Sequence, residues 1–345
     1  MSELRAPPRS TAQDVAKMAG VSPSAVSRVF TPGASASART QEKVRAAALT
    51  LSYRPNILAR SLITGRTRII GLVVAYLDNQ FYPMALEQLS RALQGEGYHV
   101  LVILAPNTED AIEPLVQELL DYQVEGLITA SVAMSNSLTA ACEGNDIPVV
   151  MFNRGQDDPR LSQVTSDNFD GGYQAARALV AGGAQRIAHI SGWAGSSTGR
   201  DRANGFQHGL TEAGRKSVAV LDGAYSREVT ESLTRKLFGG PDRPDAVFVG
   251  SDHMAFGVMG VLRFEMGLRV PEDVQVIGFD DVPMSAWPEF NMTTVAQPLA
   301  DMVAACVTTM MTKIADGPAA VARKIKLPCR LILRGSTRLP QGWTP

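Results

Sequence analysis

The sequence predicts a two-part protein, an N-terminal all-α helix-turn-helix headpiece followed by an α/β core of two doubly wound parallel-sheet subdomains. Three observations predict this fold class. Residues 11–30 carry the signals of two short helices joined by a tight turn, and from residue 69 onward short apolar runs alternate with longer amphipathic ones. Basic residues are concentrated before residue 67. The chain has 345 residues and 45% hydrophobic content, which is enough for a small domain and one or two larger ones.

The first two helices are predicted from their end signals. Thr11 is expected to cap the first helix, with Asp14 in the spacing of a capping box, and Gly20 is expected to end it. Ser22 is expected to cap the second helix, with Pro23 at its first position, where the missing N–H is not needed. The outward residues of the second helix are small or polar and include one guanidinium that can bind guanine in a bidentate way: Pro23, Ser24, Ser27 and Arg28. The pattern favours a helix-turn-helix, although a two-helix corner without a DNA role would show the same local signals.

A third helix is predicted from a Ser37 cap to Leu51, and it would close a small three-helix core. The segment 55–65 follows it. Pro55 disfavours helix before it and Asn56 can cap, so this segment is at most a two-turn helix, a length that is marginal on its own in water. We expect it to fold when two copies meet on DNA. A plain linker is the alternative.

The charge is unevenly distributed, although the formal net charge of the chain is only −1. Residues 1–66 contain ten Arg and Lys and three acidic residues, whereas the remainder contains 23 basic and 31 acidic residues. Lys and Arg release counterions condensed on a DNA duplex, so a basic module on an acidic body is suited to phosphate binding. A basic surface domain without such a role is the alternative.

The core is predicted from two series of apolar strands separated by helical stretches, as in parallel βαβ units. The expected strands are 69–74, 98–104, 126–130 and 148–152, then 186–191, 217–221, 246–250 and 274–279. Ligands of such sheets bind at the carboxyl ends of the strands, so the cleft between the two halves is the expected pocket. The strand-end residues include Asn79, Asn153 and Arg154, the loop 191–200, and Asp252, Asp280 and Asp281.

Residues 10–74 resemble the headpiece and hinge of the lactose-repressor (LacI) family of bacterial transcription regulators. The resemblance rests on the motif DVAxxAGVSxxxVSRV followed by RTxEKVxxAAxxLxYRPNxxARSL. It implies that the chain is a regulator, more often a repressor than an activator, that binds a pseudo-palindromic double-stranded DNA operator. The residues it implies at the DNA are Thr11, Ser22, Pro23, Ser24, Ser27, Arg28 and Ser37, with Asn56 and Ala59 in the hinge and Leu62 as the apolar wedge in the minor groove.

The remaining chain resembles the effector-binding core of the same family, which has a periplasmic-binding-protein-like fold. The segments DNQFYPMALEQL, SDNFDGGYQAA, RDRANGF and VIGFDD carry this resemblance. It implies a small-molecule effector, such as a sugar or sugar acid, that controls operator affinity allosterically. The expected contacts are Phe81 and Tyr82 as an apolar wall, together with Asp167, Arg200, Tyr225, Ser251 and Asp280, and Arg154 adds a cation near the mouth. Each has an alternative structural role as a cap, turn or core residue.

The expected boundaries are a headpiece over 1–54, a hinge over 55–67 and a core over 68–345. Within the core, the N-subdomain is expected to comprise about 68–164 and 298–324, and the C-subdomain about 165–297 and 325–338. Pro23 and Ser24 stand where family members often carry larger base-reading side chains, so the operator sequence does not follow from a simple code. Arg154, Arg200 and Arg202 together favour an acidic effector. No leucine-heptad tail follows LILRGSTRLPQGWTP, which argues against the extra tetramer-forming helix of some family members, so a homodimer is expected.

Other functional classes fit the sequence less well. An enzyme on this fold would need a phosphate loop or a nucleophile with a base, but GxxxxGK[ST] is absent and GWAGSSTGR lacks the lysine of such a loop. A solute-binding protein for a small sugar is the alternative function, yet it would carry an export signal rather than a basic headpiece. No apolar run is long enough to span a membrane, so we expect a cytoplasmic protein. Three scattered cysteines argue against disulfides or a metal site, and no cofactor is expected.

Overall fold

The computed structural model describes residues 10–30, 34–54, 66–105, 112–338 and 343. The chain divides into two compact units, Met1–Thr67 and Arg68–Pro345, which are described separately below. No helix among the described ranges is long and apolar enough to cross a membrane.

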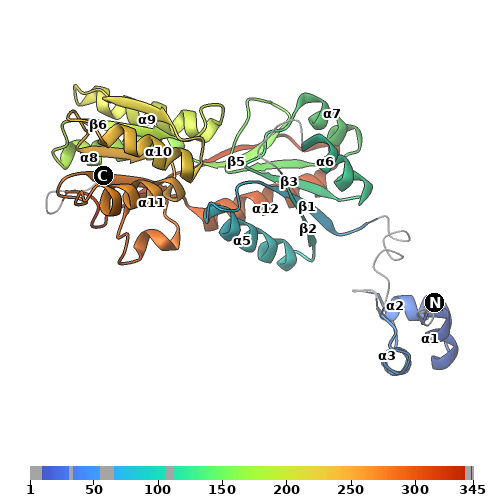
Figure 1. Cartoon of the computed structure of the whole chain (residues 1–345). Coiled ribbons are helices and arrows are strands. Elements are labelled where there is room, and N and C mark those ends of the chain that lie inside the picture. The colour runs from blue at the N-terminus through green and yellow to red at the C-terminus, as the bar shows by residue number, and fades with distance from the viewer. Residues whose placement is uncertain (1–9, 31–33, 55–65, 106–111, 339–342, 344–345) are drawn as a thin grey trace, which may run out of the picture. The chain divides into compact units, whose positions relative to one another are not determined.

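The first unit contains the three predicted helices, α1 (Ala12–Ala19), α2 (Pro23–Val29) and α3 (Ala38–Thr50) (Figure 1). Thr11 and Asp14 form the predicted capping box: the Asp14 N–H donates to Thr11 Oγ1 at 3.3 Å, and the Thr11 N–H donates to the Asp14 carboxylate at 2.8 Å. Gly20 ends α1 at φ 63°, a left-handed conformation that glycine adopts without steric cost. The side chains of Ser22 and Ser37 cap α2 and α3. These predictions from local signals are confirmed.

A small apolar core holds the three helices together. Val15, Val26 and Val44, one from each helix, are completely buried. Phe30 and Tyr53 pack against this core from the ends of α2 and α3. Burying these faces fixes which side of α2 remains exposed to solvent.

The second unit contains two six-stranded sheets, each the basis of one subdomain. The sheet of the N-subdomain has the order β11-β5-β4-β3-β1-β2, and all its neighbouring strands are parallel. Its strands are β1 (Ile69–Val74), β2 (His99–Leu104), β3 (Gly126–Ala130), β4 (Val149–Phe152), β5 (Ser162–Ser166) and β11 (Lys324–Leu327). The sheet of the C-subdomain has the order β12-β10-β9-β8-β6-β7. Its strands are β6 (Ile187–Ser191), β7 (Ala219–Asp222), β8 (Ala246–Val249), β9 (Gln275–Asp280), β10 (Thr293–Ala296) and β12 (Arg330–Ile332).

The predicted class of two doubly wound sheets is confirmed, with one difference. The edge strand β12 runs antiparallel to β10, so the second sheet is not purely parallel. The structure also contains β5, β10, β11 and β12, which the apolar pattern did not predict. They are short, and sequences such as SQVTS and KIKL contain too few consecutive apolar residues to be recognised as buried strands.

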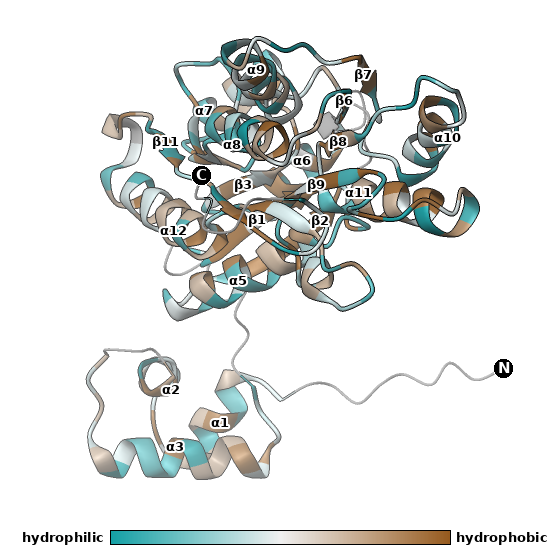
Figure 2. Cartoon of the chain, turned by 90° about the vertical axis from the view of Figure 1, so that its left-hand side faces the viewer, coloured by the Kyte–Doolittle hydropathy of each residue, from teal (hydrophilic) through white to brown (hydrophobic). Residues whose placement is uncertain are grey.

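Helices cover both faces of each sheet (Figure 1). In the N-subdomain they are α5 (Phe81–Gly95), α6 (Ile112–Asp121), α7 (Asn136–Gly144) and α12 (Leu299–Asp316). In the C-subdomain they are α8 (Asn168–Ala181), α9 (Ser197–Glu212), α10 (Arg227–Phe238) and α11 (Asp252–Gly260), which continues as a π-helical turn over Val261–Glu265. Figure 2 shows hydrophobic strands in the interior and helices that alternate between hydrophobic and hydrophilic residues, as expected for a core buried between layers.

The chain passes between the subdomains three times: from β5 to α8, from β10 to α12, and from β11 to β12. Hydrogen bonds join these connections to one another. The Asp167 N–H donates to the Leu327 carbonyl at 2.6 Å, and the Ser166 hydroxyl donates to Gln297 Oε1 at 2.7 Å. The three connections therefore lie side by side.

Candidate functional site

The exposed face of α2 is the candidate DNA-binding surface of the headpiece. Pro23, Ser24, Ser27 and Arg28 are all exposed, as predicted for the outward face of this helix. Arg28 makes no hydrogen bond or ion pair with any residue that the structure describes, so its guanidinium is available to a ligand. The six basic residues described between 10 and 54 are all exposed: Lys17, Arg28, Arg39, Lys43, Arg45 and Arg54.

The predicted hydroxyl contacts have roles within the protein as well. The Thr11 hydroxyl donates to Asp14 at 2.7 Å, and the hydroxyls of Ser22 and Ser37 accept hydrogen bonds from the first turns of α2 and α3. All three residues remain exposed, so their capping roles do not exclude a contact with phosphate. Asn56, Ala59 and Leu62 lie outside the described residues.

A cavity of about 610 Å³ lies in the cleft between the two subdomains. Its volume falls within the range of about 300–1,000 Å³ that is typical of small-molecule sites. The N-subdomain side contributes the loop after β4 and residues of β5 and β11, and the C-subdomain side contributes the start of α8, the loop after β6 and the first turns of α9. Of the eight predicted effector contacts, Arg154 and Arg200 line this cavity.

Arg154 occupies an unusual position in the cavity wall. It follows β4, and only 7% of its surface is exposed. Its guanidinium carbon lies 5.9 Å from the ring centre of Tyr76 and 5.4 Å from that of Trp193, one from each subdomain. No described residue accepts a hydrogen bond from its side chain, and its buried Nε is without a partner.

Tyr82 is buried beside this arginine, and its hydroxyl is already hydrogen-bonded. It accepts a hydrogen bond from Asn153 Nδ2 at 2.9 Å and makes a short hydrogen bond with Ser131. Burial raises the pKa of Tyr82 to about 12, which keeps the phenol neutral. Phe81 is also buried and packs edge-on against Tyr82 within the apolar core. Neither aromatic residue lines the cavity, so the predicted apolar wall is not part of its lining.

Tyr225 belongs to the same aromatic group from the other subdomain. Its ring centre lies 6.2 Å from that of Tyr76, and its hydroxyl hydrogen-bonds with Thr198 at 3.0 Å. The ring lies so close to Gly192 that a Cβ there would be 2.0 Å from it. Residue 192 must therefore lack a side chain for this ring to keep its position.

Asp280 is the last residue of β9, is only 6% exposed and does not line the cleft cavity. Its carboxylate accepts hydrogen bonds from Gln297 Nε2 at 2.7 Å and from Asn79 Nδ2, across the cleft, at 3.3 Å. Arg202 Nη1 lies 3.6 Å from the same carboxylate. Burial raises the pKa of Asp280, and the charge of Arg202 opposes this shift.

The two arginines at the start of α9 have different environments. Arg202 is 2% exposed, donates from Nε to Asn168 Oδ1 at 2.8 Å and from Nη1 to the Gly250 carbonyl at 2.5 Å, and lies over the ring of Phe279. Arg200 is exposed and pairs with its neighbour Asp201 at 3.3 Å. Of the two, Arg202 is therefore the partner of Asp280, a relationship that the sequence analysis missed.

The remaining predicted contacts serve as helix caps. The side chain of Ser251 accepts from the Met254 N–H at the start of α11, and that of Asp167 accepts from the Asp170 N–H at the start of α8. Neither residue lines the cleft cavity.

Asp252, next to Ser251, is completely buried. Its carboxylate accepts hydrogen bonds from the hydroxyls of Ser285 and Thr294, both at 2.6 Å, and from the Val282 N–H at 3.0 Å. Burial, together with the charge of Asp280, raises the pKa of Asp252.

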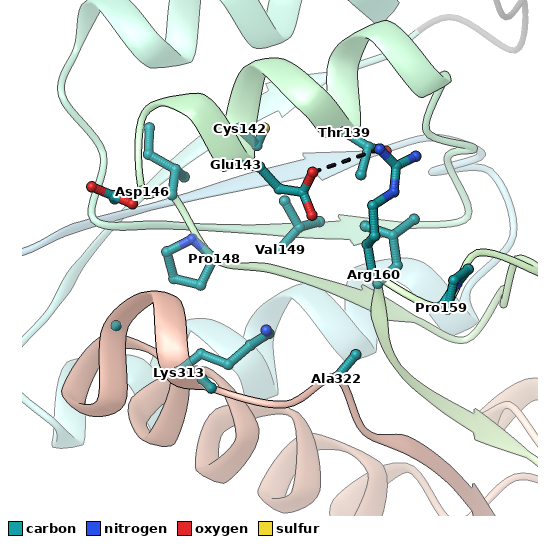
Figure 3. Close-up of a pocket in the computed structure, with 14 residues that line it drawn as sticks. Thr139, Cys142, Glu143, Asp146, Pro148, Val149, Pro159, Arg160, Lys313 and Ala322 are labelled. Carbon is teal, nitrogen blue, oxygen red and sulfur yellow. Dashed lines mark ion pairs between the residues drawn. The ribbon is translucent and has the colours of Figure 1, made fainter.

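A second cavity, of about 340 Å³, lies in the N-subdomain between α7 and the end of α12 (Figure 3). Glu143 and Arg160 face each other across it, with 3.6 Å between Oε2 and Nη1, and Arg160 also pairs with Asp158 at 2.6 Å. None of the predicted site residues lines this cavity.

Comparisons with known proteins agree with this arrangement. Residues 67–334 match the family of periplasmic binding proteins and the sugar binding domain of the LacI family, and residues 11–56 match the bacterial regulatory proteins of the lacI family. The transcriptional repressor PurR of Vibrio vulnificus (strain CMCP6) is 30% identical over 84% of this chain and 87% of its own length. Catabolite control protein A of Priestia megaterium is 28% identical over 95% of this chain and 99% of its own length.

Solved structures show the same likeness. A crystal structure of the lac repressor dimer bound to operator and an anti-inducer has a TM-score of 0.85 and 28% identity, over 96% of this chain and all of that chain. A complex of the transcriptional regulator CelR with cellobiose has a TM-score of 0.72 and 29% identity, over 95% of this chain. The class defined by these matches is a transcription regulator, not an enzyme, with a helix-turn-helix headpiece joined to a periplasmic-binding-protein-like core. The chain belongs to the LacI family of bacterial regulatory proteins.

Proposed function

We propose that this chain is a cytoplasmic, homodimeric repressor whose affinity for a pseudo-palindromic operator is controlled by a small molecule in the interdomain cleft. The observation that carries the proposal is the two-sided character of α2. Val26 on one side is completely buried in the three-helix core, whereas Ser24, Ser27 and Arg28 on the other side are exposed. A helix held in this way can enter the major groove without unfolding its own domain.

The hinge and the dimer belong to the same proposal. Asn56, Ala59 and Leu62 are proposed to contact the minor groove, with Leu62 as an apolar wedge between base pairs. Exposed valines on the edge strand β7 and just before it, at 220 and 218, and exposed apolar residues on the edge strand β2, at 102 and 104, support a second copy covering these edges. The lac repressor, which this chain resembles, has been crystallised as a dimer on its operator.

Control by a ligand is proposed to act through contacts across the cleft. Among the described residues, hydrogen bonds that join the subdomains there include those from Asn79 to Asp280 at 3.3 Å, from Gln80 to Met284 at 2.8 Å, and from the Gly155 N–H to Ser197 Oγ at 3.0 Å. A ligand that replaces or reinforces these contacts binds the core more tightly when the subdomains are at one angle than when they are at another. Such differential affinity is what shifts a conformational equilibrium.

The experiment is a selection of bound duplexes from a random-sequence library with the full-length protein, followed by gel-shift titrations on the selected and a scrambled duplex. Arg28→Ala should lower the preference for the selected sequence by about 5- to 150-fold, the equivalent of about 1–3 kcal/mol for a lost bidentate base contact. Arg45→Ala, an exposed arginine on α3, is the matched control and should leave that preference unchanged. Failure to select any sequence would contradict the proposal. Equal losses on both duplexes would make Arg28 a phosphate contact.

A further inference from the structure

The buried guanidinium of Arg154 is the most informative group in the cleft cavity. It is 7% exposed, its five N–H donors have no acceptor among the described residues, and its contacts are the rings of Tyr76 and Trp193. Aromatic faces stabilise a cation only partly, and a buried charge without a counterion is costly. The guanidinium of Arg154 therefore lacks both a hydrogen-bond acceptor and a counterion among the described residues.

The rest of the lining adds positive charge. Four basic residues and two acidic ones line the cavity: Arg154, Arg200, Lys324 and Lys326, with Asp157 and Asp201. The two carboxylates already have partners, since Arg200 Nε lies 3.3 Å from Asp201 and Lys324 Nζ lies 3.6 Å from Asp157. Because Asp157 and Asp201 pair with other basic residues, neither carboxylate serves as the counterion of Arg154. The nearest carboxylate to Lys326 is that of Asp167, at 4.0 Å.

The chemistry of the missing partner follows from that of a guanidinium. Its planar fork of donors matches the two oxygens of a carboxylate or phosphate, and such charge-assisted pairs are about twice as strong as neutral hydrogen bonds. The neighbouring lining contains amide and hydroxyl side chains, including Gln156, Gln163, Asn168 and Ser197, which suit the hydroxyl groups of a ligand.

We propose that the effector is a small hydroxylated anion whose carboxylate or phosphate group binds Arg154. This inference rests on the proposed function, because it identifies the chemical class of the ligand at the same cleft. It also explains why this arginine is held between one ring from each subdomain. An anion bound there contacts both halves of the core and so favours one angle between them.

The experiment measures thermal unfolding and calorimetric binding of the full-length protein with three probes: D-gluconate, D-glucose 6-phosphate and D-glucose. Sodium chloride keeps the ionic strength equal in all samples, because screening alone changes surface electrostatics. At millimolar concentration the carboxylate or the phosphate probe should raise the unfolding midpoint, and the neutral sugar should not. The two anionic probes distinguish a carboxylate site from a phosphate site.

Two substitutions test the role of Arg154 itself. Arg154→Met removes the charge but keeps the length of the side chain, and it should weaken binding of the anion at least about 30-fold. It should not lower the unfolding midpoint without ligand, because the charge it removes has no partner. Arg154→Lys keeps the charge but loses the fork and should retain part of the affinity. Arg91→Met, an exposed arginine paired with Glu87 on α5, is the control and should change neither quantity.

Three results would overturn the proposal: neither anion binds, glucose binds as tightly as the anions, or Arg154→Met leaves anion affinity unchanged. A lower midpoint for unliganded Arg154→Met would also contradict it, since it would show that the arginine serves the fold. Binding of the parent protein to its selected duplex is measured separately. If that binding is specific while the anions fail, the proposed function stands and only the effector class is wrong.

Discussion

Replacing Arg202 by methionine should destabilise the core far more than the same change at Arg200, although the two arginines are only two positions apart on α9. Methionine keeps apolar contact with Phe279 but cannot donate to Asn168 or to the Gly250 carbonyl. It also removes the cation 3.6 Å from Asp280, a carboxylate that is only 6% exposed.

The magnitude follows from these contacts. A hydrogen bond from a charged donor contributes about 1.5–3 kcal/mol, and Arg202 makes two. Removing one member of a buried ion pair costs about 3–5 kcal/mol in total, because the other charge remains buried without its partner. A typical domain has about 5–15 kcal/mol of stability, so Arg202→Met should be close to the limit of folding. Arg200→Met removes an exposed pair and should cost less than about 1 kcal/mol.

Tryptophan fluorescence in urea is a suitable assay, because the three tryptophans, at positions 193, 287 and 343, all lie in the core unit. The pH dependence provides a second measurement. Without Arg202, the folded-state pKa of Asp280 should rise further above its usual value of 3.8, and this rise costs stability only where the unfolded chain is ionised. The difference between variant and parent should therefore shrink as the pH falls from 7 towards 4. Equal stabilities for the two variants, or a deficit that does not change with pH, would refute the assignment of Arg202 as the partner of Asp280.

Three further predictions follow from other parts of the structure. Gly172→Ala should destabilise the core by about 1–3 kcal/mol or more, because a Cβ there would lie 2.1 Å from the Arg202 carbonyl, whereas Gly95→Ala, with no atom within 4 Å, should be neutral or slightly stabilising in the same urea assay. The raised pKa of Asp252 should cost the parent protein stability as the pH rises from about 4 towards neutrality; the pH profile of Asp252→Asn should be flatter, and an unchanged profile would contradict the shift. Leu62→Ala should weaken binding to the selected operator more than to a scrambled duplex in gel shifts, and equal effects would argue against the wedge.

The headpiece was predictable because its signals are local. The capping residues Thr11, Ser22 and Ser37 and the helix-ending Gly20 act within four residues of their own position, so each can be recognised in sequence. The central strands were predictable for a similar reason, since each is a continuous apolar run. The edge strand β11 could not be predicted in this way, because lysines alternate with apolar residues in KIKL and its place in the sheet depends on β5, far away in the chain.

The cleft was predictable only in part. Strand-end position indicated Arg154, which lines the cleft cavity, and Asp280, which does not line it but accepts a hydrogen bond from Asn79 of the other subdomain. The choice between Arg200 and Arg202 depends on the rotation of α9. Residues two positions apart on a helix point in directions about 200° apart, so of Arg200 and Arg202 one side chain faces the core and the other faces the solvent. Only the packing of α9 against α8 determines which is which. The hydrogen bond from the Asn79 side chain to the Asp280 carboxylate was also missed, because it joins one subdomain to the other.

The three chain connections between the subdomains limit how the core can move. A single connection would leave one subdomain free to turn about any axis relative to the other. Three connections that lie side by side and are hydrogen-bonded together restrain sliding and twisting, and leave bending across the cleft as the least restricted motion. The relative motion is thereby reduced to nearly one degree of freedom. A ligand in the cleft then needs only to fix that single angle, so even a few contacts on each side suffice to set the state of the whole core.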